Sequence, residues 1–312
     1  MKVSLVIVTM NRQELLKLCL EHISKSSYQD REVIVVDGSN SPEIIEANKA
    51  NSEACGAAYF SIPGIGLCKG RNLGIHESTG DIIIFVDDDI LIKEDTIDNI
   101  MPNFDEPKVM ACSVRILPLG DNESAVMQGR LISSDGGENR FRATPEELKV
   151  SLLIKTTINQ ITHPLKKIQS SKLPPPLNTG PFCFFPYRRE VFDLVGEWDE
   201  GLGGGTPAGG AEDVDMAYRV LKGGYDIVYE PKAEVYHVYR PTYEELSKVQ
   251  YRMGKVGKAL IRKYRGDKYN TTLWVGAVLN HIFHMIIDLI KLDKQSAKLE
   301  WLYISGWWKG PE

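Results

Sequence analysis

Three adjacent aspartates are the strongest chemical signal in the sequence. Asp87, Asp88 and Asp89 directly follow residues 81–86, an apolar run typical of a buried strand. At about 5 Å and an effective dielectric near 20, two such carboxylates repel each other by roughly 3 kcal/mol. Alternate residues of extended backbone face the same side, which predicts that Asp87 and Asp89 hold one divalent cation, magnesium or manganese. A solvated turn, with Asp89 capping a helix that begins at Ile90, explains the same residues.

Two basic residues lie shortly upstream, within the glycine-containing stretch 66–74. Lys69 and Arg71 are placed to meet a diphosphate, Arg71 through its bidentate guanidinium. The alternative is that both lie on the solvated start of a helix. The sequence lacks the glycine pattern of a dinucleotide-binding turn and contains no G-K-[ST] phosphate loop.

The elements that must position these residues alternate between strands and helices. Apolar runs predict strands over residues 3–8, 32–36, 57–62 and 81–86, and helical patterns cover residues 14–23, 42–54 and 70–79. This alternation predicts an α/β fold, a mostly parallel sheet with helices on both faces. Ligands of such sheets bind at the carboxyl ends of the strands, where the polar clusters lie.

A series of short motifs resembles the family 2 glycosyltransferases, which are inverting enzymes that use sugar nucleotides and have the Rossmann-like GT-A fold. The resemblance covers roughly residues 1–240. Its motifs, in order, are V-T-M-N-R at 8–12, V-V-D-G-S at 35–39, G-R-N-L-G at 70–74, F-V-D-D-D at 85–89, G-G-A-E-D-V-D at 209–215 and G-G-Y-D-I-V-Y-E-P at 223–231. Their number and order identify the family better than any single motif does.

The resemblance implies a catalytic GT-A domain over residues 1–240 and a helical C-terminal extension over residues 241–312. Within the domain, residues 1–117 would bind the nucleotide sugar and residues 118–240 the acceptor. The implied nucleotide-binding residues are Thr9, Asn11, Arg12, Asp37, Lys69, Arg71, Asp87 and Asp88. Among them, Asp37 would read the base and Asp88 would face the ribose. The implied metal ligands are Asp87, Asp89 and His237.

The E-D pair near the last motif implies the catalytic residues, Glu212 and Asp213, with Asp213 as the general base. We expect the start of a helix to keep Asp213 ionised at neutral pH, as a base must be. Without the family resemblance, Glu212, Asp213 and Asp215 would be read as acidic residues that complement a helix dipole. One departure concerns position 10, where many relatives have an aromatic residue and this chain has Met10.

Composition excludes one class of partner and indicates a compartment. The 37 Lys and Arg against 42 Asp and Glu give a net charge of −5, which excludes a general nucleic-acid binder. Five scattered cysteines, none in a C-x-x-C pair, are typical of a reducing compartment, so we expect a cytoplasmic protein.

The C-terminal extension combines basic and apolar residues. Residues 248–265 carry seven Lys and Arg and no acidic residue, and several Trp, Phe and Ile residues follow. This pattern favours a peripheral contact with the inner face of the cell membrane. A helical cap on the catalytic domain or a homodimer contact is the alternative. Polar residues interrupt the apolar stretch 273–290, so we expect no membrane-crossing helix there.

The expected activity is metal-dependent transfer of a sugar from a nucleoside-diphosphate sugar, preferably a UDP-sugar, to a hydroxyl of a glycan or lipid-linked acceptor. Residues 118–176 are expected to shape the acceptor site. Two alternatives remain: a metal-dependent nucleotidyltransferase, which would release pyrophosphate, and a non-catalytic protein that binds nucleotide sugars on the same fold.

Overall fold

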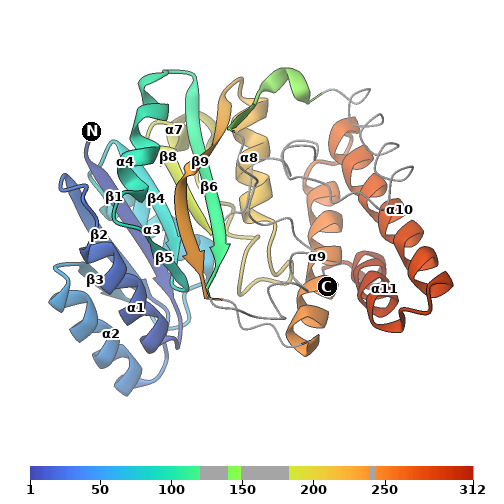
Figure 1. Cartoon of the computed structure of the whole chain (residues 1–312), viewed down its shortest axis with the longest axis horizontal. Helices are drawn as coiled ribbons and strands as arrows, with labels where there is room; N and C mark the ends of the chain where they lie inside the picture. Colours follow the sequence, from blue (N-terminus) through green and yellow to red (C-terminus); the bar gives the residue numbers. More distant parts are fainter. Residues whose placement is uncertain (120–139, 149–182, 239–242, 312) are drawn as a thin grey trace.

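The computed structural model describes residues 1–119, 140–148, 183–238 and 243–311. Within these ranges the strands form one nine-stranded sheet of order β3-β2-β1-β4-β8-β6-β9-β5, with β7 paired to β9 (Figure 1). The strands are β1 (Val3–Thr9), β2 (Arg31–Asp37), β3 (Ala58–Ser61), β4 (Ile82–Asp87), β5 (Ile90–Ile92), β6 (Val109–Pro118), β7 (Phe141–Ala143), β8 (Phe184–Arg188) and β9 (Asp226–His237).

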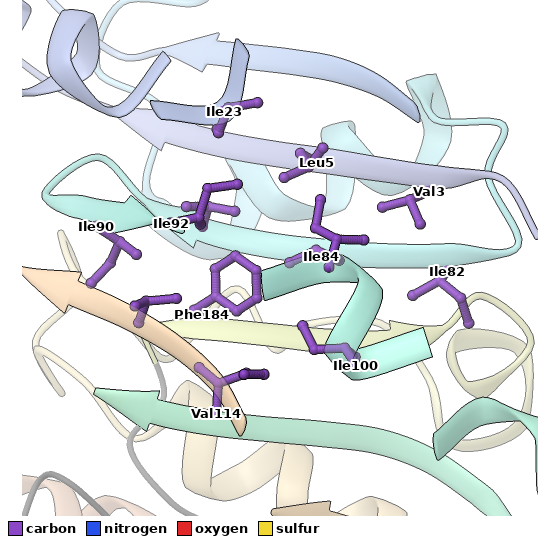
Figure 2. Packing of buried hydrophobic residues seen from close by; sticks show 14 of the residues in the cluster. Val3, Leu5, Ile23, Ile82, Ile84, Ile90, Ile92, Ile100, Val114 and Phe184 are labelled. Carbon is purple, nitrogen blue, oxygen red and sulfur yellow. The ribbon is translucent and has the colours of Figure 1, made fainter. Parts of the chain in front are cut away.

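Helices cover both faces of the sheet, as the sequence predicts. Those that come before β9 are α1 (Gln13–Ser24), α2 (Pro42–Ala54), α3 (Leu67–Glu77), α4 (Thr96–Ile100), α7 (Val191–Val195) and α8 (Glu212–Lys222), with short 3-10 turns at η1 (Met101–Asp105) and η2 (Pro145–Glu147). Side chains of β1 alternate between two cores: Val3, Leu5 and Ile7 pack with α1 and α4, and Val6 packs with α3 and α8. Figure 2 shows the first core, in which Leu5, Ile84 and Phe184 meet.

The sheet is mostly parallel, and its register aligns the polar strand ends. Strands β1, β2, β3 and β4 are parallel, with Thr9 opposite Asp37 and Val8 opposite Asp87. Strands β6 and β9 are parallel to each other, whereas β8, β5 and β7 run antiparallel to their neighbours. The carboxyl ends of β1, β2 and β4 therefore lie at one edge.

Strand β5 corrects one of the interpretations of the aspartate cluster. Residues Ile90–Ile92 form a strand and not a helix, so Asp89 caps no helix there. β5 pairs with β9 so that Ile90 lies opposite His237, and the Val238 amide donates to the Asp89 carbonyl at 2.9 Å. The turn at Asp88 and Asp89 is thus tied to the end of β9.

The chain ends in three helices, α9 (Tyr243–Lys263), α10 (Lys268–Ile290) and α11 (Lys294–Lys309). α9 and α11 cross closely at two glycines, because a Cβ on Gly306 would lie 2.0 Å from the Tyr251 carbonyl oxygen and one on Gly254 would lie 2.0 Å from that of Tyr303. Helices α9 and α10 pack on α8 through an apolar cluster. In it, Val214 and Tyr218 of α8 meet Leu260 of α9 and Trp274 of α10.

Among the described helices, α10 is long and apolar enough to cross a membrane by length and composition, with a mean hydropathy of 1.6 over its best window. Only 17% of that window is buried in the molecule. Length and composition do not decide whether α10 crosses a membrane, so the expectation that it does not remains a prediction.

Two of the sequence-based expectations fall on residues outside the described ranges. The boundary at residue 240 lies within 239–242, and most of the stretch expected to shape the acceptor site, 118–176, lies within 120–139 and 149–182.

Candidate active site

Asp88 is the anchor of the aspartate cluster. It is buried, and its carboxylate accepts a hydrogen bond from the Thr9 hydroxyl at 2.7 Å and one from the Arg12 guanidinium at 2.9 Å. The same Arg12 nitrogen lies 3.2 Å from Asp89. Burial raises the pKa of Asp88, although Thr9 and Arg12 oppose that shift. Hydrogen bonds from Thr9 and Arg12 to Asp88 therefore link the ends of β1 and β4, and all three residues were predicted to bind the nucleotide.

Asp89 meets His237 at the junction with β9. The Nε2 atom of His237 lies 3.2 Å from Oδ1 of Asp89. Burial works against ionisation of Asp89, but the hydrogen bond and charge of His237, together with Arg12, hold its pKa below the ordinary value. Two of the three expected metal ligands, which are 148 positions apart in the chain, are thus brought together by the pairing of β5 with β9.

The third expected ligand, Asp87, faces a different partner. Its Oδ1 lies 3.2 Å from a guanidinium nitrogen of Arg71 in α3. Burial raises the pKa of Asp87 to about 7, with Arg71 opposing the shift and Asp89 adding to it. Asp87 is therefore paired with Arg71, while Asp89 and His237 are paired with each other.

Arg71 is buried, and it links the aspartate cluster to the E-D pair. Its other terminal nitrogen lies 3.6 Å from Glu212 at the start of α8. The guanidinium also stacks over Trp198, 4.6 Å from the ring centroid. Burial lowers the pKa of Arg71, but Asp87 and Glu212 outweigh it, and the pKa stays above its ordinary value. Arg71 was expected to meet a diphosphate; the structure places it between these two carboxylates.

Asp213 occupies the first turn of α8, as the sequence predicts. Its Oδ1 accepts a hydrogen bond from the Val214 amide at 2.7 Å. The expectation that the helix start keeps it ionised is not met, because burial, and then the charge of Glu212, raise the pKa of Asp213 to about 7. The loop before it turns sharply: Ala211 has φ of +81° and Gly209 of +68°.

Asp37 lies at the carboxyl end of β2, fully buried. It accepts hydrogen bonds from the Ser39 amide at 2.8 Å, the Asn48 amide group at 2.7 Å and the Tyr59 hydroxyl at 2.6 Å. The sequence analysis missed Asn48 and Tyr59. A polar residue on the buried side of a predicted helix is the signal that could have revealed Asn48.

The remaining expected site residues lie at the rim. Asn11 is exposed and has a φ of +57°, and its backbone N–H donates a hydrogen bond to the Ser39 hydroxyl at 2.8 Å. Lys69 is exposed and lies 3.9 Å from Glu200. Trp198, which the Arg71 guanidinium covers, is a core residue that packs edge-on against Phe85.

Carboxylate oxygens and one imidazole suit magnesium or manganese in their chemistry. In the described part of the chain, no group of three or more His, Cys, Asp and Glu side chains is arranged to hold an ion by itself. Such cations are commonly held by one or two carboxylates together with substrate phosphates. Asp89 and His237, with Asp87 two residues before Asp89 at the end of β4, fit a cation site that a diphosphate completes.

Comparisons with known proteins identify the family and the fold. The sequence profile of Glycosyl transferase family 2 matches residues 4–196. The chain is 34% identical over 107 residues to the glycosyltransferase GlyG of Streptococcus pneumoniae serotype 4, a match that spans 33% of this chain and 35% of that protein. It is 26% identical over 250 residues to the O-antigen chain rhamnosyltransferase RfbN of Salmonella typhimurium, spanning 78% of this chain and 69% of RfbN.

Solved structures share the fold. The mannosyltransferase PcManGT from Pyrobaculum calidifontis, solved in complex with GDP-Man and Mn2+, has a TM-score of 0.64 at 15% identity, and the match covers 99% of this chain and 86% of that one. TarS 1-349 of S. aureus in complex with UDP-GlcNAc has a TM-score of 0.54 at 15% identity, covering 99% and 91%. The profile match extends over more than half of the sequence, and the chain belongs to glycosyl transferase family 2, with the GT-A fold.

Proposed function

We propose that this glycosyltransferase transfers a sugar, with inversion, from a nucleoside-diphosphate sugar to a hydroxyl group of a glycan or lipid-linked acceptor. A UDP-sugar is the favoured donor, and magnesium or manganese is the divalent cation. One observation carries the proposal: the aspartate cluster at the end of β4 and the E-D pair at the start of α8 share a single buried partner, Arg71. The donor-binding and acid-base parts of the site would then lie next to each other.

The residues on the donor side divide into two groups. Thr9, Asn11, Arg12 and Asp88 would hold the ribose and phosphates, with Lys69 at the exposed rim, and Asp37 would lie nearest the base. Asp89 and His237, with Asp87, would hold the cation. When bound, the cation would neutralise the charge of the departing diphosphate without any proton transfer.

On the acceptor side, Asp213 would take the proton of the attacking hydroxyl. A pKa near 7 suits this role, because a base titrating near the working pH is a strong enough proton acceptor and is still about half ionised at pH 7. Glu212 would keep Asp213 basic through its negative charge, while Arg71 holds Glu212 in place. The proton would leave the acceptor oxygen as that oxygen forms its bond to the anomeric carbon.

The structures of relatives support a nucleotide sugar as the donor, and a screen of sugar nucleotides tests this proposal. PcManGT was solved with GDP-Man and TarS with UDP-GlcNAc, so nucleotide sugars with either base are candidates. We would measure release of nucleoside diphosphate from a panel of UDP-, GDP- and dTDP-sugars, with and without manganese. Release of nucleoside diphosphate supports the proposal, whereas release of pyrophosphate would identify a nucleotidyltransferase, and binding without turnover a non-catalytic protein.

Asp213→Asn tests the chemistry once an acceptor is known. The amide keeps the shape of the side chain but cannot accept the proton, and positioned bases contribute about 10²–10⁴-fold. We expect transfer to fall by that factor while donor affinity and the unfolding temperature stay close to those of the native chain. Near-normal transfer by a well-folded Asp213→Asn variant would refute the assignment.

A further inference from the structure

The outer face of α10 carries a continuous apolar stripe. Val275, Leu279, Ile286 and Ile290 are spaced four or seven positions apart, and Leu289 lies three positions after Ile286, so all five fall on one side of the helix, and each is exposed. The stripe extends about 22 Å along the helix axis, at 1.5 Å per residue. In Figure 1, α10 lies at the end of the molecule farthest from α2 and β3.

In the second half of α10 the opposite face is polar and already has a partner, whereas in the first half Leu273 and Trp274 are buried in the apolar cluster with α8. The Nδ1 atom of His281 is hydrogen-bonded to Glu300 of α11, and the imidazole stacks on the Tyr303 ring, 3.6 Å between centroids. His284 and Asp288 fall on this same side by their helical spacing. A helix with one polar, packed side and one apolar, exposed side is suited to lie along an interface, and it is poorly suited to be surrounded by lipid.

The turn after α10 extends the apolar surface. Leu292 is 80% exposed and has a φ of +61°, a left-handed conformation in which glycine or asparagine is ordinarily favoured. It lies beside Ile290, which is 76% exposed, and between the exposed lysines Lys291 and Lys294. On α11, Trp301 and Trp308 are exposed as well. Aromatic residues and lysines around an apolar tip are typical of the membrane–water interface.

Charge is divided unevenly along the chain, and this identifies the surface that the stripe meets. Residues 241–312 carry 12 Lys and Arg against 7 Asp and Glu, a net charge of +5, whereas the whole chain has −5 and residues 1–240 therefore carry −10. An anionic surface attracts the helical extension and repels the catalytic region. A second copy of the chain would bring two positive extensions together at this face, which disfavours a dimer through it.

We propose that the α10 stripe and the turn at Leu292 dock on the surface of a bilayer that contains anionic lipids. Lysines near such a surface add to binding electrostatically, and the apolar side chains enter the boundary between headgroups and acyl chains. The inference does not depend on the identity of donor or acceptor. Since α8 packs on these helices, docking would also fix the orientation of the candidate base relative to the membrane.

The test is flotation of the full-length chain with vesicles of phosphatidylcholine alone or with about one third phosphatidylglycerol. We expect binding to the anionic vesicles that weakens in 1 M salt, which screens the charges. Burying one Leu or Ile contributes enough for about a ten-fold change in partitioning. The variant Leu279→Gln/Ile290→Gln should therefore lose about 100-fold, and Leu194→Gln, with an exposure of 51% against 52% for Leu279, should bind as the native chain does.

The double variant and the Leu194→Gln control replace only exposed side chains, so the unfolding temperature of each should equal that of the native chain. An unchanged unfolding temperature excludes misfolding as the cause of a loss of binding. The proposal is overturned if the native chain does not float with anionic vesicles, or if the double variant binds as well as the Leu194→Gln control. It is also overturned if light scattering finds a dimer that the double variant splits. Resistance of the bound chain to both 1 M salt and alkaline carbonate would show a membrane-crossing α10 instead.

Discussion

Arg71 is the buried cation on which both halves of the site depend, and replacing it with methionine should destabilise the whole protein. Methionine keeps the apolar stem but removes the charge that lies 3.2 Å from Asp87 and 3.6 Å from Glu212. Breaking a buried ion pair by removing one partner costs about 3–5 kcal/mol, because a charge is left without compensation. The side chain of Glu212 is only 11% exposed, so Glu212 carries most of the cost; Asp87, whose pKa is already raised to about 7, can take up a proton instead.

We therefore expect the lower part of that range, about 3 kcal/mol, out of a typical total of about 5–15 kcal/mol. The assay is urea unfolding at pH 7, followed by the intrinsic fluorescence of the five tryptophans, one of which is Trp198, over which the guanidinium stacks. The double variant Arg71→Met/Glu212→Gln supplies the control: with the stranded charge gone, it should recover most of the loss. A loss below about 1 kcal/mol, or a double variant no more stable than Arg71→Met, would refute this account of the site.

Three further predictions follow from the site and the helices. Transfer should rise with pH up to about 7 and then level off, since burial raises the pKa of Asp213 to about 7 and only the ionised base accepts a proton; a rate that is constant from pH 5 to 8 would contradict it. Asp89→Ala should abolish the manganese dependence of nucleoside diphosphate binding, measured by calorimetry, and His237→Ala should reduce that dependence by less. An unchanged manganese titration in His237→Ala would show that this histidine is not a ligand of the cation. Gly306→Ala should lower the free energy of unfolding by about 1–3 kcal/mol, because its Cβ would lie 2.0 Å from a carbonyl oxygen, and Gly204→Ala, which meets nothing closer than 3.8 Å, is the control.

The elements of the first half were predictable because each has a simple local cause. The strand over residues 3–8 and the helix over residues 42–54 are found as expected, at Val3–Thr9 and Pro42–Ala54. Once alternation implies a parallel sheet, the side chains that follow the strands must meet at one edge, so Thr9 and Asp88 could be placed together in advance.

The partners of the charged residues could not be predicted in the same way. The burial of Arg71 depends on Trp198 and Glu212, which are more than 120 positions away, and no local pattern distinguishes a buried arginine from one that meets a phosphate. The pKa of Asp213 was misjudged for a related reason: the helix start is visible in sequence, whereas the burial that outweighs it is a property of the assembled fold.

Strand β9 has a further consequence, for how the chain folds as it is made. It is the last strand in sequence, yet it lies between β6 and β5 and is the strand with which β5 pairs. Until His237 has been synthesised, the edges of β5 and β6 lack this neighbour, and at about 5–20 residues per second the wait from Ile92 is on the order of ten seconds. Nascent chains in this interval expose apolar strand edges that favour aggregation, so chaperone capture should be strongest before β9 emerges. His237, the last residue of β9, also forms the pair with Asp89. Completion of the sheet is therefore coupled to assembly of the proposed metal ligands.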